Sequence, residues 1–402
     1  MKVPFSPPKI NQETIDAVTE VLNSGWITTG PKTKEFEDLL SDYTGAKKVL
    51  AANSATAGLE LILRWYGVGP GDEVIVPSYT YCSTANVVLH CGATPVMCDI
   101  KNDFNIDPKE IEEKITEKTK VIIPVDLGGF PADYDLINDI AKRNKEKFTA
   151  HSPEQEKLGR ILVMSDAAHS IGAKMNGSRT GNLTDVTVFS FHAVKNLTTV
   201  EGGSICLNLP EPFDNEEIYK SLRTFSLHGQ SKDAFSKTKV GGWEYDVAFA
   251  GYKCNMPDIL AVIGLVELNR YSETLERRAA VFKMYHEALS NYSWAELPVY
   301  STLEKESSYH VYLLRIKGVT KEQRDSIMQE MYNREIAVNI HFKPLPLLSL
   351  YKGLGYSMEK YPKAMDAYKR EISLPVFYDM TNEQVKMVID NLVEVISNVL
   401  GV

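Results

Sequence analysis

Cysteine is scarce in this sequence. The 402 residues include five cysteines, their spacing is irregular, and no two of them form a Cys-x-x-Cys pair. A small, odd set of this kind predicts neither a disulfide framework nor a zinc site. Cys98 and Cys206 lie in apolar runs, where a free cysteine usually serves as a small core residue. We therefore expect no disulfides and no metal site.

Long apolar runs and an excess of positive charge are also missing. No run has membrane-spanning length, and residues 1–5 do not begin a signal-peptide pattern. Lys and Arg number 44 against 53 Asp and Glu, a net charge of −9. This balance argues against non-specific binding to nucleic acid or to an anionic membrane, although one phosphorylated substrate remains compatible. We expect a cytoplasmic protein with neither nucleic acid nor membrane among its partners.

What the sequence does contain is a regular alternation of strand and helix patterns. Hydrophobic residues make up 44% of the chain, enough for a large buried core. Strands are expected at 48–52, 73–77, 95–99, 121–125, 161–164, 185–191 and 204–207. Helical patterns between most of them predict an α/β fold with a mostly parallel central sheet flanked by helices. The polar stretch 143–160 is interpreted as a surface insertion.

The two ends of the chain have patterns of their own. Pro4, Pro7 and Pro8 indicate an extended N-terminal arm, a helix is expected from Asn11, and Thr33 could cap the next helix. After a long helical pattern from residue 258, strands are expected at 311–316 and 337–340 and a helix at 382–399. We predict a large domain at 1–269, including the arm, and a smaller C-terminal α+β domain at 270–402.

Lys195 is the most informative residue of the chain. It ends the motif Ser190-Phe191-His192-Ala193-Val194-Lys195 and precedes a glycine pair at 202–203. Upstream, Asp166 follows the apolar run 161–164, where an acid is costly unless it is paired. An expected strand separates the two residues, and ligands of open α/β sheets bind at the carboxyl ends of strands. We expect Asp166 and Lys195 to meet at one edge of the sheet.

These groups match the needs of pyridoxal 5′-phosphate (PLP). Lys195 could form a Schiff base, Asp166 could keep the ring nitrogen protonated, and the Ser190 hydroxyl could bind phosphate. The glycine pair allows a close approach of the backbone. A lone lysine in a loop is usually a solvated surface residue. The prediction therefore depends on Lys195 occurring together with Asp166, Ser190 and the glycine pair.

Three further pieces are less specific. Small residues at 53–58 could turn the amides of a helix N-terminus toward an anion, or form an ordinary helix cap. The stretch 79–84 could place an aromatic ring on the pyridine, or bury it in the core. His169 could reach the ring oxygen of the cofactor or support Asp166, and Asp166 alone could be a helix cap.

The motifs at 166–172, 189–196 and 201–203 together resemble those of the DegT-type sugar-nucleotide aminotransferases. Supporting similarities at 24–31, 77–81, 124–129, 251–256 and 373–375 extend the resemblance over nearly the whole chain. It implies PLP fold type I, PLP as cofactor, and transamination of a keto sugar attached to a nucleoside diphosphate. The Ser-Phe-His-Ala-x-Lys form is most similar to members that act at C4 of a UDP-linked 4-keto sugar. Glutamate is the expected amino donor, and the product would serve cell-surface polysaccharide or glycan biosynthesis.

The resemblance also implies roles for individual residues. Carried over by position, it makes Lys195 catalytic, assigns cofactor contacts to Ala55, Thr56, Tyr81, Asp166, His169, Ser190 and Asn255, and assigns substrate contacts to Trp26, Thr28 and Glu201. Tyr81 would stack on the ring, and Ala55, Thr56 and Ser190 would hold the phosphate. Asn255 would reach the cofactor phosphate of the neighbouring subunit, which implies a homodimer with shared active sites.

Two departures from the family pattern and three alternatives accompany this interpretation. Pro346 stands where many members have histidine, and the insertion at 143–160 is longer than expected.

Family members that deoxygenate or dehydrate sugars carry histidine in place of the lysine, so Lys195 favours transamination. A nicotinamide-dependent sugar oxidoreductase ranks low because no Gly-x-Gly-x-x-Gly follows the first expected strand. A PLP-binding regulator without turnover is disfavoured by the acidity and by the lack of a DNA-binding appendage.

Overall fold

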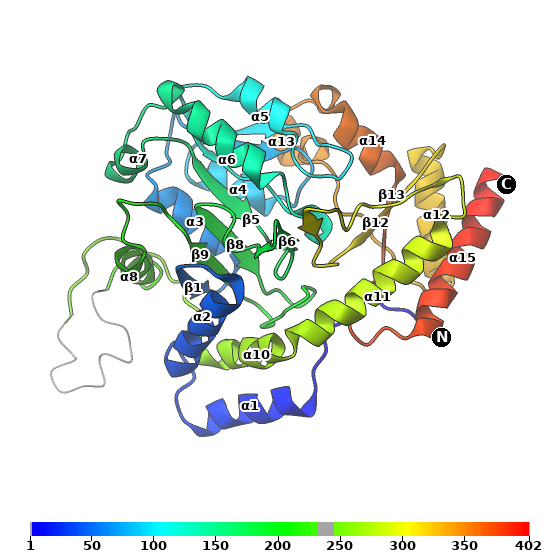
Figure 1. Cartoon of the computed structure of the whole chain (residues 1–402), viewed down its shortest axis with the longest axis horizontal. Helices are drawn as coiled ribbons and strands as arrows, with labels where there is room; N and C mark the ends of the chain where they lie inside the picture. Colours follow the sequence, from blue (N-terminus) through cyan, green and yellow to red (C-terminus); the bar gives the residue numbers. More distant parts are fainter. Residues whose placement is uncertain (1, 231–244, 402) are drawn as a thin grey trace.

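A seven-stranded sheet forms the centre of the protein. The structure is a computed structural model that describes residues 2–230 and 245–401 (Figure 1). The sheet has the order β1-β9-β8-β5-β4-β2-β3. Its strands are β1 (Lys48–Ala52), β2 (Glu73–Pro77), β3 (Thr94–Cys98), β4 (Thr119–Ile122), β5 (Leu162–Asp166), β8 (Val186–Ser190) and β9 (Gly203–Leu207). β9 runs opposite to the other six strands, which share one direction, and this confirms the predicted mostly parallel sheet.

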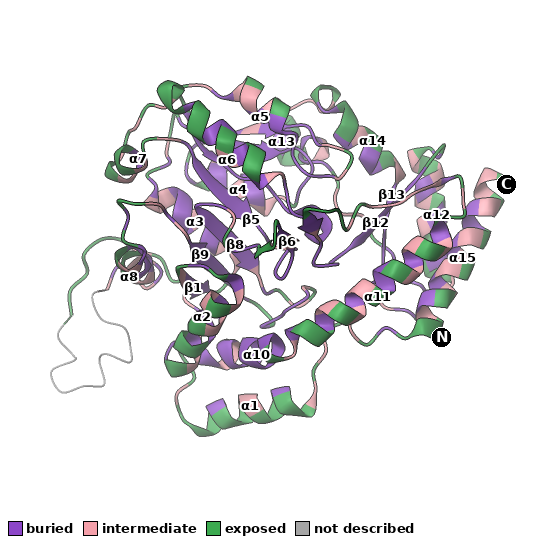
Figure 2. Ribbon diagram, in the orientation of Figure 1, coloured by how far each residue is buried: buried purple, intermediate pink, exposed green. Residues whose placement is uncertain are grey.

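Helices cover both faces of this sheet (Figure 1). They are α2 (Pro31–Thr44), α3 (Ala55–Trp65), α4 (Ser83–His90), α5 (Pro108–Lys114), α6 (Tyr134–Arg143), α7 (Pro153–Leu158), α8 (Asn215–Phe225) and α10 (Asp258–Asn269), with short 3₁₀ turns η1 (Leu127–Gly129) and η2 (Lys145–Lys147). A further helix, α1 (Gln12–Asn23), packs on the outer side of α10 (Figure 1). Val74 and Val76 of β2 belong to one apolar cluster with α3 and α4, whereas Ile75 belongs to another with α5 and α6. Adjacent strand residues point to opposite faces, so both faces are buried (Figure 2).

The C-terminal part has a separate antiparallel sheet and its own apolar cluster. It contains α11 (Tyr271–Leu289), β10 (Ala295–Glu296), β11 (Lys305–Glu306), β12 (Tyr312–Ile316), α12 (Lys321–Asn333), η3 (Leu345–Leu347), α13 (Ser349–Gly353), η4 (Met358–Lys360), α14 (Pro362–Arg370), β13 (Glu371–Leu374) and α15 (Asn382–Leu400). The sheet order is β10-β12-β13, and Tyr285, Leu314 and Val388 join α11, β12 and α15 in one core. A third small sheet pairs β11 with β6 (Lys174–Met175) and β7 (Ser178–Arg179). The smaller α+β part is confirmed, while the exact boundary at 269/270 stays a prediction.

Three local expectations were wrong or incomplete. Residues 337–340 form a single bridge at Asn339 and no strand, because the preceding Ile336 pairs with Val3 of the N-terminal arm. Thr33 lies inside α2, whose N-cap is Gly30. The stretch 143–160 contains α7 and is anchored by the buried Gln155 side chain.

The N-terminal arm joins the two parts of the molecule. The Val3 N–H donates to the carbonyl of Glu335, and the Ala337 N–H donates to the carbonyl of Val3, each at 2.9 Å. Further along, the Ser6 hydroxyl donates to the carbonyl of Val194 at 3.2 Å, next to Lys195. The arm therefore links the C-terminal part to the loop that carries the lysine. Within the described residues, no helix combines the length and the apolarity that crossing a membrane requires.

Candidate active site

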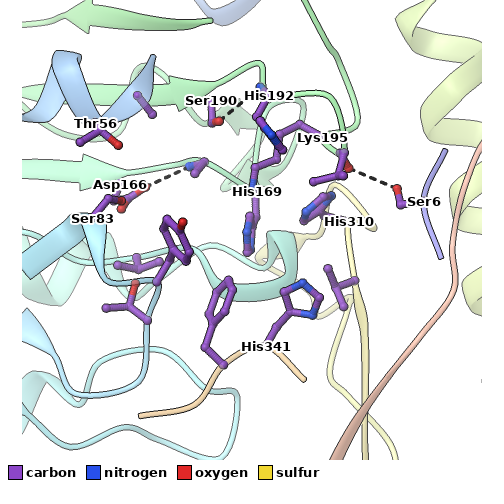
Figure 3. Close-up of a pocket in the computed structure, with 18 of the residues that line it drawn as sticks. Ser6, Thr56, Ser83, Asp166, His169, Ser190, His192, Lys195, His310 and His341 are labelled. Carbon is purple, nitrogen blue, oxygen red and sulfur yellow. Dashed lines mark hydrogen bonds between the residues drawn. The ribbon is translucent and has the colours of Figure 1, made fainter. Parts of the chain in front are cut away.

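The carboxyl ends of the parallel strands open into a cavity of about 470 Å³ (Figure 3). Of the predicted site residues, this cavity brings together Ala55, Thr56, Tyr81, Asp166, His169, Ser190, Lys195 and Glu201. The N-terminal arm contributes Phe5 and Ser6, and the C-terminal part contributes His310, His341 and Phe342. The site therefore has one wall made by the sheet and one made by elements distant in sequence.

Lys195 lies in the loop between β8 and β9. The side chain of Asn196 ties this loop to the C-terminal part, because its amide donates to the carbonyl of Ser308 at 2.7 Å. Burial lowers the pKa of Lys195 to about 8, and the nearby Asp166 acts in the opposite direction. A lowered pKa increases the fraction of neutral amine near neutral pH, and the neutral amine is the nucleophilic form.

Asp166 is the last residue of β5 and is buried beneath the cavity. Its Oδ2 accepts a hydrogen bond from the Thr84 hydroxyl at 2.8 Å, and its Oδ1 accepts one from the Ala168 N–H at 3.3 Å. Burial raises the pKa of Asp166, while these hydrogen bonds and the charge of Lys195 lower it. A buried acid with two neutral donors suits a cationic N–H in the cavity, such as that of a pyridinium ring.

A corner whose backbone amides suit a phosphate lies at the start of α3. Ser54 is the N-cap, and its hydroxyl accepts a hydrogen bond from the Ala57 N–H at 3.1 Å. The first amides of a helix have no partner within the helix, so those of Ala55 and Thr56 remain available to an anion. Ser190 and Thr56 line the same side of the cavity (Figure 3). The Ser54 cap is observed, and anion binding by the amides of Ala55 and Thr56 stays a prediction that this cap does not exclude.

Gly203 of β9 makes this corner possible. A Cβ atom at this position would lie 2.4 Å from the Ala55 nitrogen, closer than any real contact. Only glycine allows the N-terminus of α3 to approach the strand so closely.

His169 has a defined ring orientation. The Gly128 N–H donates to Nδ1 of His169 at 3.3 Å, so Nδ1 is an acceptor and Nε2 carries the proton. Burial and the charge of Lys195 hold the pKa of His169 well below its usual range. The ring of His310 lies 4.4 Å away, centroid to centroid. His169 thus offers an N–H donor suited to the ring oxygen of a cofactor.

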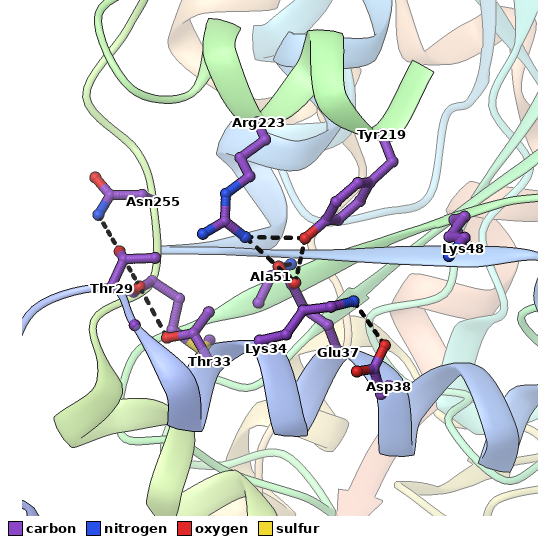
Figure 4. A network of polar contacts seen from close by, with 12 residues as sticks. Thr29, Thr33, Lys34, Glu37, Asp38, Lys48, Ala51, Tyr219, Arg223 and Asn255 are labelled. Carbon is purple, nitrogen blue, oxygen red and sulfur yellow. Dashed lines mark hydrogen bonds and ion pairs between the residues drawn. The ribbon is translucent and has the colours of Figure 1, made fainter. Parts of the chain in front are cut away.

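Trp26, Thr28 and Asn255 lie outside this cavity. The Asn255 amide donates to the Thr29 hydroxyl (Figure 4). The Thr28 carbonyl accepts the Asp258 N–H at 3.1 Å. The roles carried over to these three residues stay predictions.

Sequence reasoning missed several residues of the site. Thr84, His310 and His341 had no assigned role, because tertiary packing brings the two histidines to the cavity and Thr84 to Asp166. The only local signal for Thr84 is its spacing of four from Thr80, whose hydroxyl lies 3.0 Å away.

Comparison with known proteins agrees with this geometry. The model of the DegT/DnrJ/EryC1/StrS aminotransferase family matches residues 8–393. The chain belongs to this family. The SpsC protein of Bacillus subtilis (strain 168), named for spore coat polysaccharide biosynthesis, is 36% identical over an aligned length of 401 residues, and the match covers 98% of this chain and 97% of SpsC. The resemblance found in the sequence is thereby confirmed.

Solved structures of this aminotransferase family extend the comparison. Spr1654 of Streptococcus pneumoniae, provisionally named a sugar aminotransferase, matches in its PMP form with a TM-score of 0.96 and 47% identity, over 99% of this chain and 100% of that one. Its PLP form matches with a TM-score of 0.95. Helicobacter pylori PseC, an aminotransferase involved in the biosynthesis of pseudoaminic acid, matches with a TM-score of 0.88 and 27% identity, over 99% of this chain and 100% of that one.

The cofactor of this aminotransferase is PLP, and the residues of the cavity fit it. Asp166 would hold the ring nitrogen, the corner of Ala55, Thr56 and Ser190 would hold the phosphate, and Lys195 would supply the amine. Bound PLP supplies an electron sink for the carbon that loses a proton. The family assignment also removes the nicotinamide-dependent oxidoreductase from the alternatives.

Proposed function

We propose that this aminotransferase transfers the amino group of glutamate to C4 of a UDP-linked 4-keto-6-deoxy sugar. The observation that carries the proposal is the meeting of Lys195, with its pKa lowered to about 8, and the buried Asp166 in one cavity. The name of SpsC, for spore coat polysaccharide biosynthesis, supports a product used in a cell-surface polysaccharide or glycan. The expected location in the cytoplasm stays a prediction.

In this proposal each side chain has a separate task. Lys195 is the one base that would take the proton from Cα of the amino donor and deliver it to C4′ of the cofactor, and the same base would carry out the reverse transfer in the sugar half of the cycle. Asp166 keeps the ring nitrogen protonated. Glu201, on the cavity rim, contacts the sugar. Phe5 and Phe342 exclude water from the reacting atoms.

We also infer a homodimer with shared active sites. Asn255 does not line the cavity of its own chain and is part-exposed, so a neighbouring subunit could present its cofactor phosphate there. Trp26 and Thr28 lie in the same region and are proposed to contact substrate from there. A mixture of an Asn255→Ala chain with a Lys195→Ala chain tests this, because only a shared site gives activity that differs from the sum of the two parents.

The first experiment is a spectrum of the purified, PLP-loaded protein. We expect a visible absorption band that glutamate bleaches and that Lys195→Ala abolishes without unfolding the protein. Lys118→Ala, an exposed lysine on the surface, is the matched control and should leave the band unchanged. An unchanged spectrum in Lys195→Ala would refute the assignment of the lysine.

The second experiment identifies the acceptor. The glutamate-treated protein is mixed with UDP-, dTDP- and GDP-linked keto sugars, and recovery of the visible band is followed with product analysis. Recovery with the UDP-linked 4-keto sugar supports the proposal. Release of a dehydrated sugar without nitrogen would support the dehydratase alternative instead.

A further inference from the structure

The second wall of the cavity places a neutral histidine opposite the cofactor groups. His341 lines the cavity (Figure 3), and its ring stacks on Phe5 with a centroid distance of 5.5 Å. Burial, followed by the charge of Lys195, lowers the pKa of His341 to about 3, so the ring stays neutral. A neutral imidazole has one N–H donor and one acceptor nitrogen. Its tautomer therefore decides what His341 offers to a molecule in the cavity.

A chain of hydrogen bonds leads from this ring into the C-terminal part. Nδ1 of His341 lies 2.8 Å from the Ser373 hydroxyl oxygen, which in turn bonds to Oε1 of Glu371. Oε2 of Glu371 accepts the backbone N–H of His341 at 3.2 Å. Glu371 and Ser373 are two residues apart on β13, so their side chains share one face, and neither is exposed. Glu371 does not line the cavity itself, and the hydrogen bonds to Ser373 and His341 connect it to the cavity.

The single hydroxyl proton of Ser373 permits two arrangements of this chain. When Glu371 is ionised, Ser373 donates to it and accepts from Nδ1–H of His341, which leaves Nε2 as a bare acceptor. When Glu371 is protonated, its O–H donates to Ser373, Ser373 donates to Nδ1, and Nε2 carries the proton. Across residues 2–230 and 245–401, Nε2 has no hydrogen-bond partner and is free to bind a molecule in the cavity.

Both arrangements are accessible in ordinary buffers. Burial raises the pKa of Glu371 to about 8, while the hydrogen bonds that it accepts and the charges of Arg324 on α12 and Arg315 on β12 lower it. The Tyr79 hydroxyl interacts electrostatically with Glu371 and Arg324. Burial raises the pKa of Tyr79, so this hydroxyl stays neutral. His169 and His310 beside the His341 ring are held neutral as well, because burial lowers their pKa values.

We propose that Glu371 and Ser373 are positioning residues that set the tautomer of His341, and so decide whether Nε2 donates to or accepts from the sugar. With Glu371 protonated, Nε2–H holds a carbonyl or hydroxyl oxygen of the sugar. With Glu371 ionised, Nε2 accepts a hydroxyl proton instead. The identity of the ligand as a sugar rests on the proposed function, whereas the proton positions can be measured without any sugar.

The test is the ¹⁵N solid-state NMR spectrum of the PLP-loaded protein with labelled histidine, recorded well below and well above pH 8, the pKa of Glu371. The chain has only eight histidines, and His341→Gln identifies the His341 signals by their loss. We expect Nε2–H below that pKa and Nδ1–H above it. An unchanged tautomer across this range in the wild-type protein overturns the proposal.

Three variants separate the relay from a general effect of pH. Glu371→Gln should show Nε2–H at both pH values, because its amide can still donate to Ser373 but cannot ionise. Ser373→Ala should remove the pH dependence, and Ser373→Thr, which keeps the hydroxyl, should restore it. A change of tautomer with pH that persists in Ser373→Ala overturns the proposal.

Turnover gives an independent measurement. Loss of one hydrogen-bonded partner should raise the KM of Ser373→Ala for the keto sugar about three- to tenfold, more than it changes kcat. Ser373→Thr should recover most of this loss, and a KM equal to that of the wild-type protein in Ser373→Ala contradicts the proposal. Failure of the proposed function would give a different result. The wild-type protein would then turn over no keto sugar, while the tautomer of His341 would still change with pH.

Discussion

The protein buries carboxylates in two regions that differ in how the carboxylate is satisfied. Glu37 on α2 lies beneath the edge strand β1, where its Oε1 accepts the Ala51 N–H at 2.9 Å and its Oε2 accepts the Tyr219 hydroxyl at 2.6 Å (Figure 4). Asp166 lies beneath the cavity, with one close donor from Thr84 and a longer one from the backbone. Glu37 is enclosed by its own chain, whereas Asp166 borders a space for a ligand.

The difference shows that a raised pKa alone does not identify a functional acid. Burial raises the pKa of Glu37 to about 7, and burial also raises that of Asp166. Glu37 uses its oxygens to satisfy an edge-strand amide and to hold α8 against the sheet, which is a structural task. What distinguishes Asp166 is the cavity at its side and the nearby amine of Lys195.

The largest expected effect is the loss of activity in Asp166→Asn. An amide cannot hold the ring nitrogen of PLP in its protonated form, so we expect transamination to fall about 100-fold or more. The melting temperature should not fall, because the change removes a buried charge. Steady-state assays and thermal unfolding measure both, with the exposed Asp139→Asn as control. Full activity in Asp166→Asn would contradict the view that Asp166 is a functional acid and Glu37 a structural one.

Glu37→Leu should give the opposite result. The change leaves the Ala51 N–H and the Tyr219 hydroxyl without their buried acceptor, which costs about 2 kcal/mol of unfolding free energy. Thermal or denaturant unfolding should show this loss, while the visible band of bound PLP stays as in the wild-type protein. Loss of the band in a folded Glu37→Leu protein would instead give Glu37 a functional role.

Thr84→Val should have a smaller effect, confined to activity. Valine has the shape of threonine but cannot donate to Asp166, so we expect kcat to fall about tenfold. Thr84→Ser keeps the hydroxyl and should retain most of the activity. Equal kinetics for the valine and serine variants would show that the Thr84 hydrogen bond does not support Asp166.

The smallest expected effect is a shift in a pH profile. Because the neutral amine of Lys195 reacts with PLP, the rate at which cofactor-free protein takes up PLP should rise with pH through about 8, the pKa of Lys195. Asp166 raises that pKa, so Asp166→Asn should move the midpoint of the profile to lower pH. Glu37→Leu should leave the midpoint where it is, and stopped-flow absorbance at a series of pH values compares the three proteins.

Much of the sheet side of the site could be predicted from the sequence. Asp166, Ser190 and Lys195 lie at or just after the ends of neighbouring strands, and such ends meet at one edge of a sheet. Alternating strand and helix patterns gave the order of the elements, because their periodicities are local. The family resemblance added Ala55 and Thr56, whose own signal is that of any helix N-terminus.

The opposite wall could not be predicted, because nothing local brings it to the cavity. His310 and His341 arrive through packing of the C-terminal part, more than 100 residues from Lys195 along the chain. The expected strand at 337–340 failed for a related reason, since its neighbour Ile336 pairs with the arm at Val3. Long-range pairing leaves no periodic pattern in either partner.

The N-terminal arm has a consequence for proteolysis. Val3 is held by the C-terminal part and Ser6 by the carbonyl of Val194, so a cut between them separates two anchor points without touching the central sheet. A nicked molecule would keep its fold and lose Val3 as a tie between Phe5 and the C-terminal part. After a brief protease treatment, mass spectrometry would measure cleavage between Val3 and Ser6, and an activity assay would show whether the attachment of Val3 to the C-terminal part is needed for turnover.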